Sequence, residues 1–329
     1  MSAASPPAQQ AATRWRPPQL PGAASRYALP AVFTLLLVVL LITTPEFRNW
    51  NNIANILQQN AMIGIVACGM LVMIVTGGFD LSVGAVGAMT SVATAWLVGQ
   101  TSPVLGIAGA LLLAVAVGLV NGIAIAKVGI SPFVATLGTQ VLVTGILYVS
   151  TSAAPVYGLP PEFAVFGQSR VGGIPTVALI FLGVIVATWA MLRFTRFGHY
   201  LYAVGGNRQA ARLAGVNADR ILLLAYVFGA LCAGIAGLVL VTQTGIGQPN
   251  SATTWPLSAI AAVVVGGVPL AGGAGRVSSA VLGTLLLGVV ANALNLLGVS
   301  SYWQPAVTGV VILVAVGIDS YQRKRASQT

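Results

Sequence analysis

Charged side chains are scarce in this chain of 329 residues: they make up 6% of it, with only five acidic residues and one histidine. A soluble domain carries about a quarter charged residues, so this composition excludes a soluble globule. Hydrophobic residues make up 57% and recur along the whole length, together with 39 glycines. This pattern is typical of a polytopic bundle of membrane helices rather than of a soluble domain with one anchor.

Several motifs that carry chemistry are also missing. The two cysteines, Cys68 and Cys232, both fall inside apolar runs, which indicates packing as small hydrophobic side chains rather than a disulfide or a metal site. We find no H-E-x-x-H, paired-cysteine, G-x-S-x-G or phosphate-loop pattern. We therefore expect no catalytic residue, no metal, no cofactor and no ATP site on this chain. The 15 Lys and Arg residues lie between apolar runs and do not form a stripe with stacking aromatics, so nucleic acid is not an expected partner.

The apolar runs predict an all-α membrane protein with about ten transmembrane helices, since a span needs about 20 mostly apolar residues. The predicted spans are 27–44, 56–76, 81–99, 104–125, 133–152, 174–192, 221–242, 257–271, 277–297 and 303–319. Residues 1–26, rich in Pro, Ala and Gln, are expected to be a disordered tail, 27–320 the transmembrane domain, and 321–329 a basic tail. The first span ends in TTPEFRNW, without a signal-peptide cleavage site, so it is expected to remain uncleaved.

The basic residues predict the orientation of these spans. If the amino terminus is cytoplasmic, all of the 15 Lys and Arg except Arg48 and Arg170 fall on the inner side. Short cytoplasmic loops collect Lys and Arg, so this asymmetry predicts an even number of spans and two cytoplasmic termini.

One acidic residue, Asp80, lies close to the middle of a hydrophobic region, in the stretch GGFDLSVGA at 77–85. A carboxylate at membrane depth is a functional candidate, for a gate or an ion site. The structural alternative is a helix cap, in which Asp80 accepts hydrogen bonds from the first N–H groups of a helix that begins at Leu81. A second stretch, GGVPLAGGA at 266–274, shares G-G-x-x-L-x-x-G-A with the first and suggests an internal repeat whose broken helices meet. The gate or helix-cap candidates are Gly77, Gly78, Asp80, Ser82, Gly84, Gly266 and Gly267.

Uncharged polar residues inside the spans are candidates for the lining of a solute pathway. These are Gln59, Asn60, Asn121, Asn292 and Asn295. Hydrogen bonds between helices are the alternative explanation for such residues. A polar but uncharged lining suits a hydroxyl-rich solute better than an ion.

The longest inner connection contains GGNRQAARLAGVNADR at 205–220. It predicts a short helix that stops at Gly215, with Arg208 and Arg212 four residues apart on one side. Two interpretations remain open on these residues alone: a basic helix lying on anionic lipid headgroups, or a helix that docks into a cytoplasmic protein partner.

Five motifs in order make the chain resemble the permease subunits of carbohydrate ATP-binding cassette importers of the ribose, xylose and arabinose type. They are GGFDLSVGA at 77–85, ISPFVATLGT at 130–139, GGNRQAARLAG at 205–215, AAVVVGGVPLAGGAGRV at 261–277 and NALNLLGVSSYWQ at 292–304. The inner loop looks like a degenerate form of the importer docking motif E-A-A-x-x-x-G, with Gln209 in place of the acid. The resemblance implies a docking loop made of Gly206, Asn207, Arg208, Gln209, Ala210, Ala211, Arg212 and Gly215.

The resemblance also implies the partners: ATPase subunits inside, a soluble extracytoplasmic sugar-binding protein outside, a second permease copy forming a homodimer, and the lipids of a bacterial inner membrane. The expected function is therefore the translocation subunit of an ATP-driven sugar importer. The alternatives are an ion-coupled secondary carrier for a small polar solute that uses Asp80, or a channel or scaffold without energy coupling.

Overall fold

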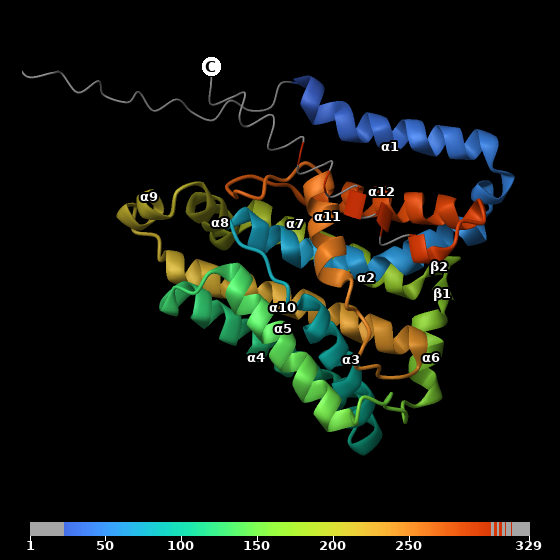
Figure 1. Cartoon of the computed structure of the whole chain (residues 1–329), viewed down its shortest axis with the longest axis horizontal. Helices are drawn as coiled ribbons and strands as arrows, with labels where there is room; N and C mark the ends of the chain where they lie inside the picture. The colour runs from blue at the N-terminus through green and yellow to red at the C-terminus, as the bar shows by residue number, and fades with distance from the viewer. Residues whose placement is uncertain (1–22, 304–305, 308, 311–312, 314–316, 318–329) are drawn as a thin grey trace, which may run out of the picture.

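The computed structural model describes residues 23–303 together with 306–307, 309–310, 313 and 317 (Figure 1). The described chain is helical apart from loops and one two-stranded hairpin, which confirms the all-α prediction. The helices are α1 (Ala23–Thr43), η1 (Pro45–Arg48), α2 (Trp50–Val75), α3 (Val83–Gln100), α4 (Pro103–Ile123), the π-helical η2 (Ala124–Val128), α5 (Pro132–Thr151), α6 (Pro161–Gln168), α7 (Thr176–Phe194), α8 (Arg196–Gly206), α9 (Arg208–Leu213), α10 (Ala218–Thr244), α11 (Trp255–Val265), α12 (Val277–Leu296) and η3 (Ser301–Trp303). The hairpin pairs β1 (Arg170–Val171) with β2 (Ile174–Pro175).

Seven helices of the described chain are long and apolar enough to cross a membrane: α2, α3, α4 with its π-helical extension, α5, α7, α10 and α12. They match seven of the ten predicted spans. More than half of the predicted span 303–319 falls outside the described residues, and the basic tail 321–329 and residues 1–22 lie wholly outside them. Helix α1 begins at Ala23, inside the predicted tail, and its apolar part is Pro30–Thr43.

The predicted span 257–271 is wrong in its extent, because α11 ends at Val265. Gly267 adopts a left-handed φ of +87°, and its N–H donates to the carbonyl of Val264 at 2.8 Å, which closes the last turn. A helix of 11 residues is about 16 Å long, roughly half the thickness of the hydrocarbon core. The sequence missed this because the apolar residues continue past the glycines that stop the helix.

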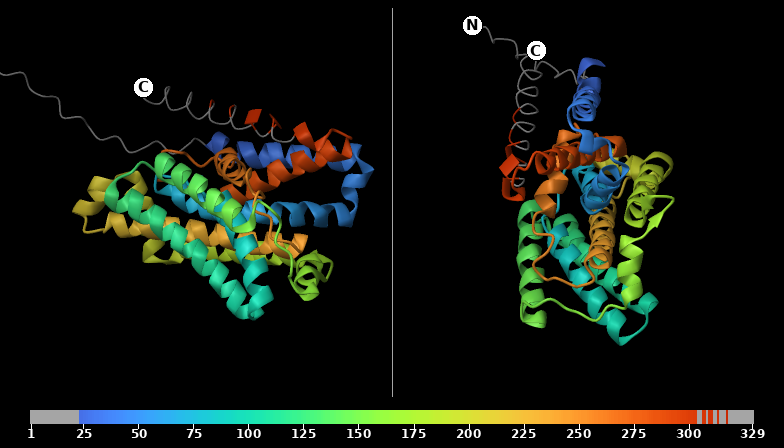
Figure 2. Two further views of the ribbon diagram at one scale, coloured as in Figure 1. Left: turned by 60° about the horizontal axis from the view of Figure 1, so that its bottom comes forward. Right: turned by 90° about the vertical axis from the view of Figure 1, so that its right-hand side faces the viewer.

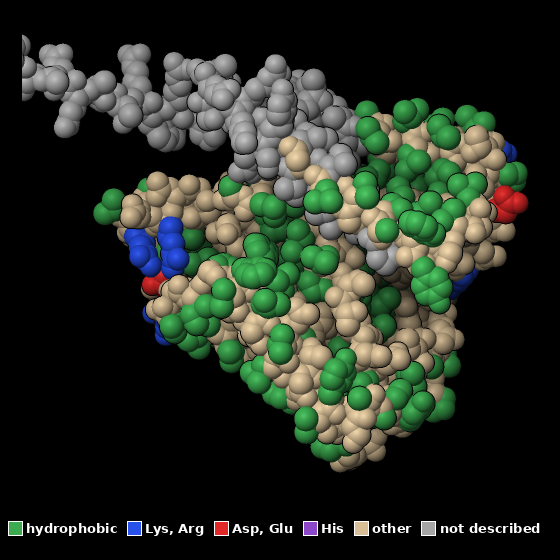
Figure 3. Space-filling view, viewed as in Figure 1, with side chains coloured by type: hydrophobic (Ala, Val, Ile, Leu, Met, Phe, Trp, Pro, Cys, Tyr) green, Lys and Arg blue, Asp and Glu red, His purple; other side chains and the backbone are tan. Residues whose placement is uncertain are grey.

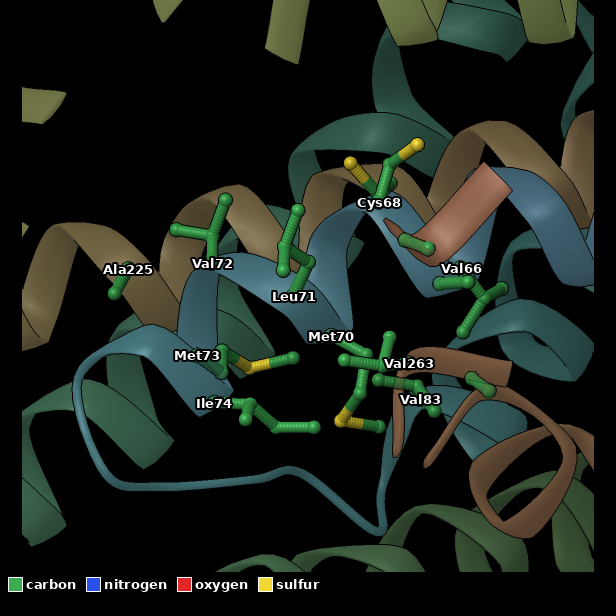
Figure 4. Packing of buried hydrophobic residues seen from close by; sticks show 14 of the residues in the cluster. Val66, Cys68, Met70, Leu71, Val72, Met73, Ile74, Val83, Ala225 and Val263 are labelled. Carbon is green, nitrogen blue, oxygen red and sulfur yellow. The ribbon is translucent and has the colours of Figure 1, made fainter. Parts of the chain in front are cut away.

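Helix α2 forms the centre of the bundle. It packs against α10, α12, α7 and α11, and its residues from Ala67 to Val75 are all buried. Figure 4 shows several of these side chains with Val263 of α11 and Ala225 of α10 in the same cluster. Gly69 lets α10 approach α2 closely, since a Cβ there would lie 2.9 Å from Cβ of Cys232. Both cysteines are free and buried, as expected of small packing side chains.

The outer helices leave apolar side chains uncovered. Helix α5 has exposed Val141, Leu142 and Ile146, and Val149 is 85% exposed. Figure 3 shows green hydrophobic side chains spread over the face of the described chain. In water such a surface would cause aggregation, so its natural contacts are lipid tails or another apolar chain.

The two ends of the bundle differ (Figures 1 and 2). One end carries α8 and α9, and the opposite end carries η1, α6 and the β1–β2 hairpin. The hairpin is tied to the start of α2, because Trp50 Nε1 donates to the carbonyl of Gly173 at 3.2 Å and an Arg170 guanidinium nitrogen donates to Asn51 Oδ1 at 2.8 Å. The connection between α5 and α7, which contains α6 and the hairpin, is therefore an ordered cover over one end of the bundle.

Candidate functional sites

The predicted docking segment folds as the short helix α9. Asn207 is its N-cap and accepts from the N–H of Ala210 at 2.9 Å. After the helix ends, the N–H of Gly215 donates to Arg212 O and the N–H of Val216 to Ala211 O, both at 3.0 Å. These two bonds with Gly215 at φ +83° form a Schellman motif. The predicted helix and its glycine stop are confirmed.

A charged cluster fixes α9 to the start of α10. Arg208 and Arg212 both donate to Asp219 Oδ1, at 2.8 and 2.6 Å, as expected of residues four apart on one helix face. Figure 3 shows this cluster at one end of the molecule as blue groups beside a red one. Arg208 also donates to the carbonyl of Ala126 at 3.4 Å, in the π-helical end of α4. The sequence analysis did not assign this role to Asp219, although it comes only seven residues after Arg212.

The exposed face of α9 carries a hydrophobic residue that the sequence analysis missed. Ala211 is buried against the bundle, whereas Gln209 and Ala210 face outward. Leu213 is 91% exposed at the last turn. Solvent exposure of a lone leucine is common, but here it stands on a basic helix at one end of the bundle. The spacing of Leu213 two residues after Ala211 was the available signal, since such neighbours point to different sides of a helix.

Asp80 does not cap a helix in the way that was predicted. Helix α3 begins at Val83, and its N-cap Ser82 makes no side-chain capping bond. Asp80 Oδ1 instead accepts from both the backbone N–H and the hydroxyl of Ser82, each at 2.6 Å. In this local turn Asp80, two residues before the cap position, orders the entry to α3. The carboxylate is fully buried, consistent with a residue at membrane depth.

A buried polar network surrounds this turn. Asn121 of α4 donates to Asp80 Oδ2 at 3.3 Å and to Ser82 Oγ at 2.9 Å, while its Oδ1 accepts from Thr139 of α5 at 2.6 Å. Thr136 of α5 accepts from the N–H of Leu81 at 3.1 Å. Among the described residues no Lys or Arg side chain donates to this network, so neutral donors satisfy the Asp80 carboxylate. Asn121 therefore joins helices rather than lining an open path, which was the alternative for such residues.

The glycine-rich segments meet at what we call the glycine junction: residues 75–78, 205–206 and 271–275. The N–H of Gly273 donates to the carbonyl of Val75 at 2.8 Å. A Cβ on Gly272 would lie 2.7 Å from the backbone nitrogen of Gly77, and one on Gly205 would lie 1.8 Å from Val75 O. The predicted meeting of the two related glycine segments is thus confirmed, and α8 joins them, since Tyr202 donates to Gly275 O at 2.9 Å.

The other candidate glycines, Gly78, Gly84 and Gly266, make close contacts of their own outside the glycine junction, except that Gly78 lies at its edge. A Cβ on Gly78 would lie 2.4 Å from the hydroxyl of Tyr226, which donates to Phe79 O at 3.3 Å. A Cβ on Gly84 would lie 2.4 Å from Ala252 O, and one on Gly266 would lie 2.1 Å from Ser279 O. Each glycine therefore permits a close contact of backbones or of a backbone with an aromatic hydroxyl.

Two of the predicted pathway residues line a cavity. Gln59 and Asn60 of α2 face a hollow of about 250 Å³ between α2, α11 and α12. The other asparagines lie elsewhere: Asn292 exchanges two hydrogen bonds with Asn52, at 3.1 and 2.8 Å, and Asn295 is exposed near the end of α12. The structure thus brings together only part of the predicted polar lining. Among the described residues no group of three or more His, Cys, Asp or Glu could hold a metal ion.

The sequence comparisons place the chain in a known family. The family described as "Branched-chain amino acid transport system / permease component" matches residues 52–316, and the chain belongs to it. The ribose import permease protein RbsC of Escherichia coli K12 is 42% identical over 297 residues, which cover 88% of this chain and 92% of the relative. The L-arabinose transport system permease protein AraH of the same strain is 37% identical over 300 residues, covering 91% and 92%. No solved structure matches the chain.

These matches confirm the resemblance drawn from the five motifs. The chain is a permease component of an ATP-binding cassette transport system and a multi-pass protein of the bacterial inner membrane. Such a component forms the membrane part and leaves catalysis to other subunits.

Proposed function

We propose that this chain is the translocation subunit of an ATP-driven importer of a monosaccharide such as ribose or arabinose, working as a homodimer. The observation that carries the proposal is α9: a capped, stopped and ion-paired helix that protrudes from one end of a nearly uncharged bundle. The relatives named above are a ribose import permease and an L-arabinose transport permease, which supports this substrate class. Because the chain has no phosphate-loop motif, the energy must come from an ATPase partner.

The distribution of basic residues supports a cytoplasmic location for α9. Arg193, Arg196, Arg220 and Arg276 all lie next to helix ends on the side of α8 and α9, whereas Arg48 and Arg170 lie at the opposite end. By the positive-inside rule, this distribution supports α9 in the cytoplasm, on the side of the ATPase, and the β1–β2 hairpin outside, on the side of a sugar-binding protein. The exposed apolar face of α5 is available for lipid or the second permease copy.

An ion-coupled carrier that uses Asp80 has less support. The carboxylate already accepts from Ser82 and Asn121, and its surroundings are closed, since Asp80, Ser82 and Asn121 are all fully buried. An ion site needs ligands that can be reached and released.

Deletion of 207–214 tests the proposal. We expect it to abolish sugar-stimulated ATP hydrolysis by the complex purified from native membranes, while the chain still inserts into the membrane. Gly215→Pro should have the same effect, because proline cannot adopt φ +83° and the Schellman motif is lost. Capture of no ATPase with the wild-type chain, or unchanged stimulation in the deletion, would contradict the proposal.

A further inference from the structure

The cavity of about 250 Å³ between α2, α11 and α12 has the lining of a small ligand site. Gln59, Asn60, Thr254, Ser258 and Thr284 bring polar groups to it, and Trp255 brings an aromatic ring. None of these side chains is charged. Pockets for drug-sized ligands measure about 300–1,000 Å³, so this one suits a smaller molecule.

Most of these polar groups have hydrogen-bonding capacity to spare. Within the part of the chain that the structure describes, the side chains of Gln59, Thr254 and Ser258 make no hydrogen bond. Asn60 uses one N–H to donate to Ile56 O at 2.7 Å, which leaves its Oδ1 and its second N–H. The cavity therefore offers several donors and acceptors of neutral type, which match a ring of hydroxyl groups and do not match an ion.

Two glycines hold the walls in place. A Cβ on Gly288 would lie 2.2 Å from Asn60 Nδ2, so the absence of a side chain there lets Asn60 lie flat against α12. A Cβ on Gly87 would lie 2.5 Å from Cζ3 of Trp255, so α3 approaches the indole from behind. The ring is 6% exposed and is thus fixed by packing, with its remaining surface on the cavity. An immobile aromatic face costs little entropy when it meets the C–H face of a sugar.

The position of the cavity fits a solute that arrives from the end opposite α9. It is lined by the middle of α2, the first two turns of α11, and the middle and second half of α12, all away from the helix ends that meet at the glycine junction. Gln59 and Thr254 are exposed at its rim. A solute released at that end meets these two residues before the buried ones.

We propose that this cavity is a low-affinity subsite for a neutral monosaccharide, built within a single permease subunit by Gln59, Asn60, Thr254, Ser258 and Trp255. The inference rests on the proposed function. It adds the place in the permease where the sugar binds, and a second selection of the sugar after that by the external binding protein. Spare neutral hydrogen bonds without a charge give binding that is weak enough for release, as transport requires.

Saturation-transfer NMR on the purified full-length chain in lipid nanodiscs tests the subsite directly. The probes are D-ribose, L-arabinose and sucrose, without ATPase or binding protein. We expect transfer to either monosaccharide and none to sucrose, which is too large. Asn60→Ala and Ser258→Ala should each lower the monosaccharide affinity about three- to tenfold, the effect of losing one hydrogen bond. The matched control is Ser91→Ala, since Ser91 is buried on α3 without a partner for its hydroxyl and does not line the cavity.

Uptake by the reconstituted complex separates the two proposals. Asn60→Ala and Ser258→Ala should slow uptake of the transported monosaccharide relative to the Ser91→Ala control complex. If the wild-type complex imports sugar but neither variant alters transfer or uptake, the subsite is wrong and the importer stands. If the wild-type complex imports no sugar, both proposals fail. Where Asn60→Ala or Ser258→Ala lowers the unfolding temperature, Gln59→Ala on the exposed rim supplies the same readout.

Discussion

Two aspartates of this chain show how differently the two key regions are held. Asp219, beside α9, is 40% exposed and binds two guanidinium groups. Asp80, in the turn between α2 and α3, is fully buried and binds only Ser82 and Asn121. At an exposed site, water can take the place of the carboxylate as the partner of the two arginines. The ion pairs of Asp219 therefore orient α9 but contribute little to the stability of the fold. At the buried site of Asp80, water cannot replace a lost hydrogen-bond partner, so the neutral donors to this carboxylate are essential to that part of the fold.

The glycine junction joins the two regions, and Gly205→Ala should disrupt it most strongly. Its new Cβ would lie 1.8 Å from Val75 O and 2.8 Å from the nitrogen of Gly273, both backbone atoms that cannot rotate away. Overpacking costs about 1–3 kcal/mol, and a backbone clash belongs at the top of that range or above. We expect a lower unfolding temperature in detergent and loss of coupled ATP hydrolysis.

The neighbouring Gly206 provides the matched control. A Cβ there meets nothing within 4 Å, so Gly206→Ala should leave the unfolding temperature close to wild type. Equal behaviour of the two variants would show that α8 does not rest on Val75 in the membrane.

Asp80 should show the next largest effect. Asp80→Ala removes the acceptor for Ser82 and Asn121, and each buried group left unpaired costs about 1–3 kcal/mol. Asp80→Asn keeps one carbonyl oxygen for Ser82 and should be clearly milder. The measurement is the thermal unfolding midpoint of each variant together with its uptake rate. If both variants stay folded and lose uptake equally, the charge itself matters and the purely structural role of the turn is wrong.

The sequence could predict features formed by residues close together in the chain, but not contacts between residues that are far apart in it. Gly215, Arg208 and Arg212 lie within eight residues of one another, so spacing alone predicted their helix and its stop. Asn121 reaches Asp80 across 41 positions, and no local pattern pairs them. The cavity likewise depends on the packing of α2, α11 and α12, with Gly288 of α12 against Asn60 and Gly87 of α3 against Trp255. Gln59 and Asn60 could therefore be suspected from the sequence, but Trp255 could not.

At the exposed end, Leu213→Asp should weaken docking without altering the fold. Leu213 is 91% exposed, so its replacement costs the isolated chain almost nothing. If the leucine enters a cleft of the ATPase, a buried carboxylate there should lower the affinity at least tenfold, measured by titrating ATPase onto the chain in nanodiscs. Leu105→Asp, 65% exposed on α4 away from α9, serves as the control for a general effect of a new charge. Unchanged affinity in Leu213→Asp would place the contact on another face of α9.

The smallest effect belongs to Asp219→Asn. The side chains of Arg208 and Arg212 are 40% and 51% exposed, so water and salt already screen both ion pairs. Such pairs contribute about 0–1 kcal/mol, and the asparagine oxygen can still accept a hydrogen bond from one guanidinium. We expect an unfolding temperature within experimental error of wild type, with a modest loss of ATPase affinity that fades as salt rises, because the arginines lose their fixed orientation. A loss of stability as large as that of Asp80→Ala would remove the contrast between the two aspartates, and would show that α9 is part of the folded core rather than a helix oriented on its surface.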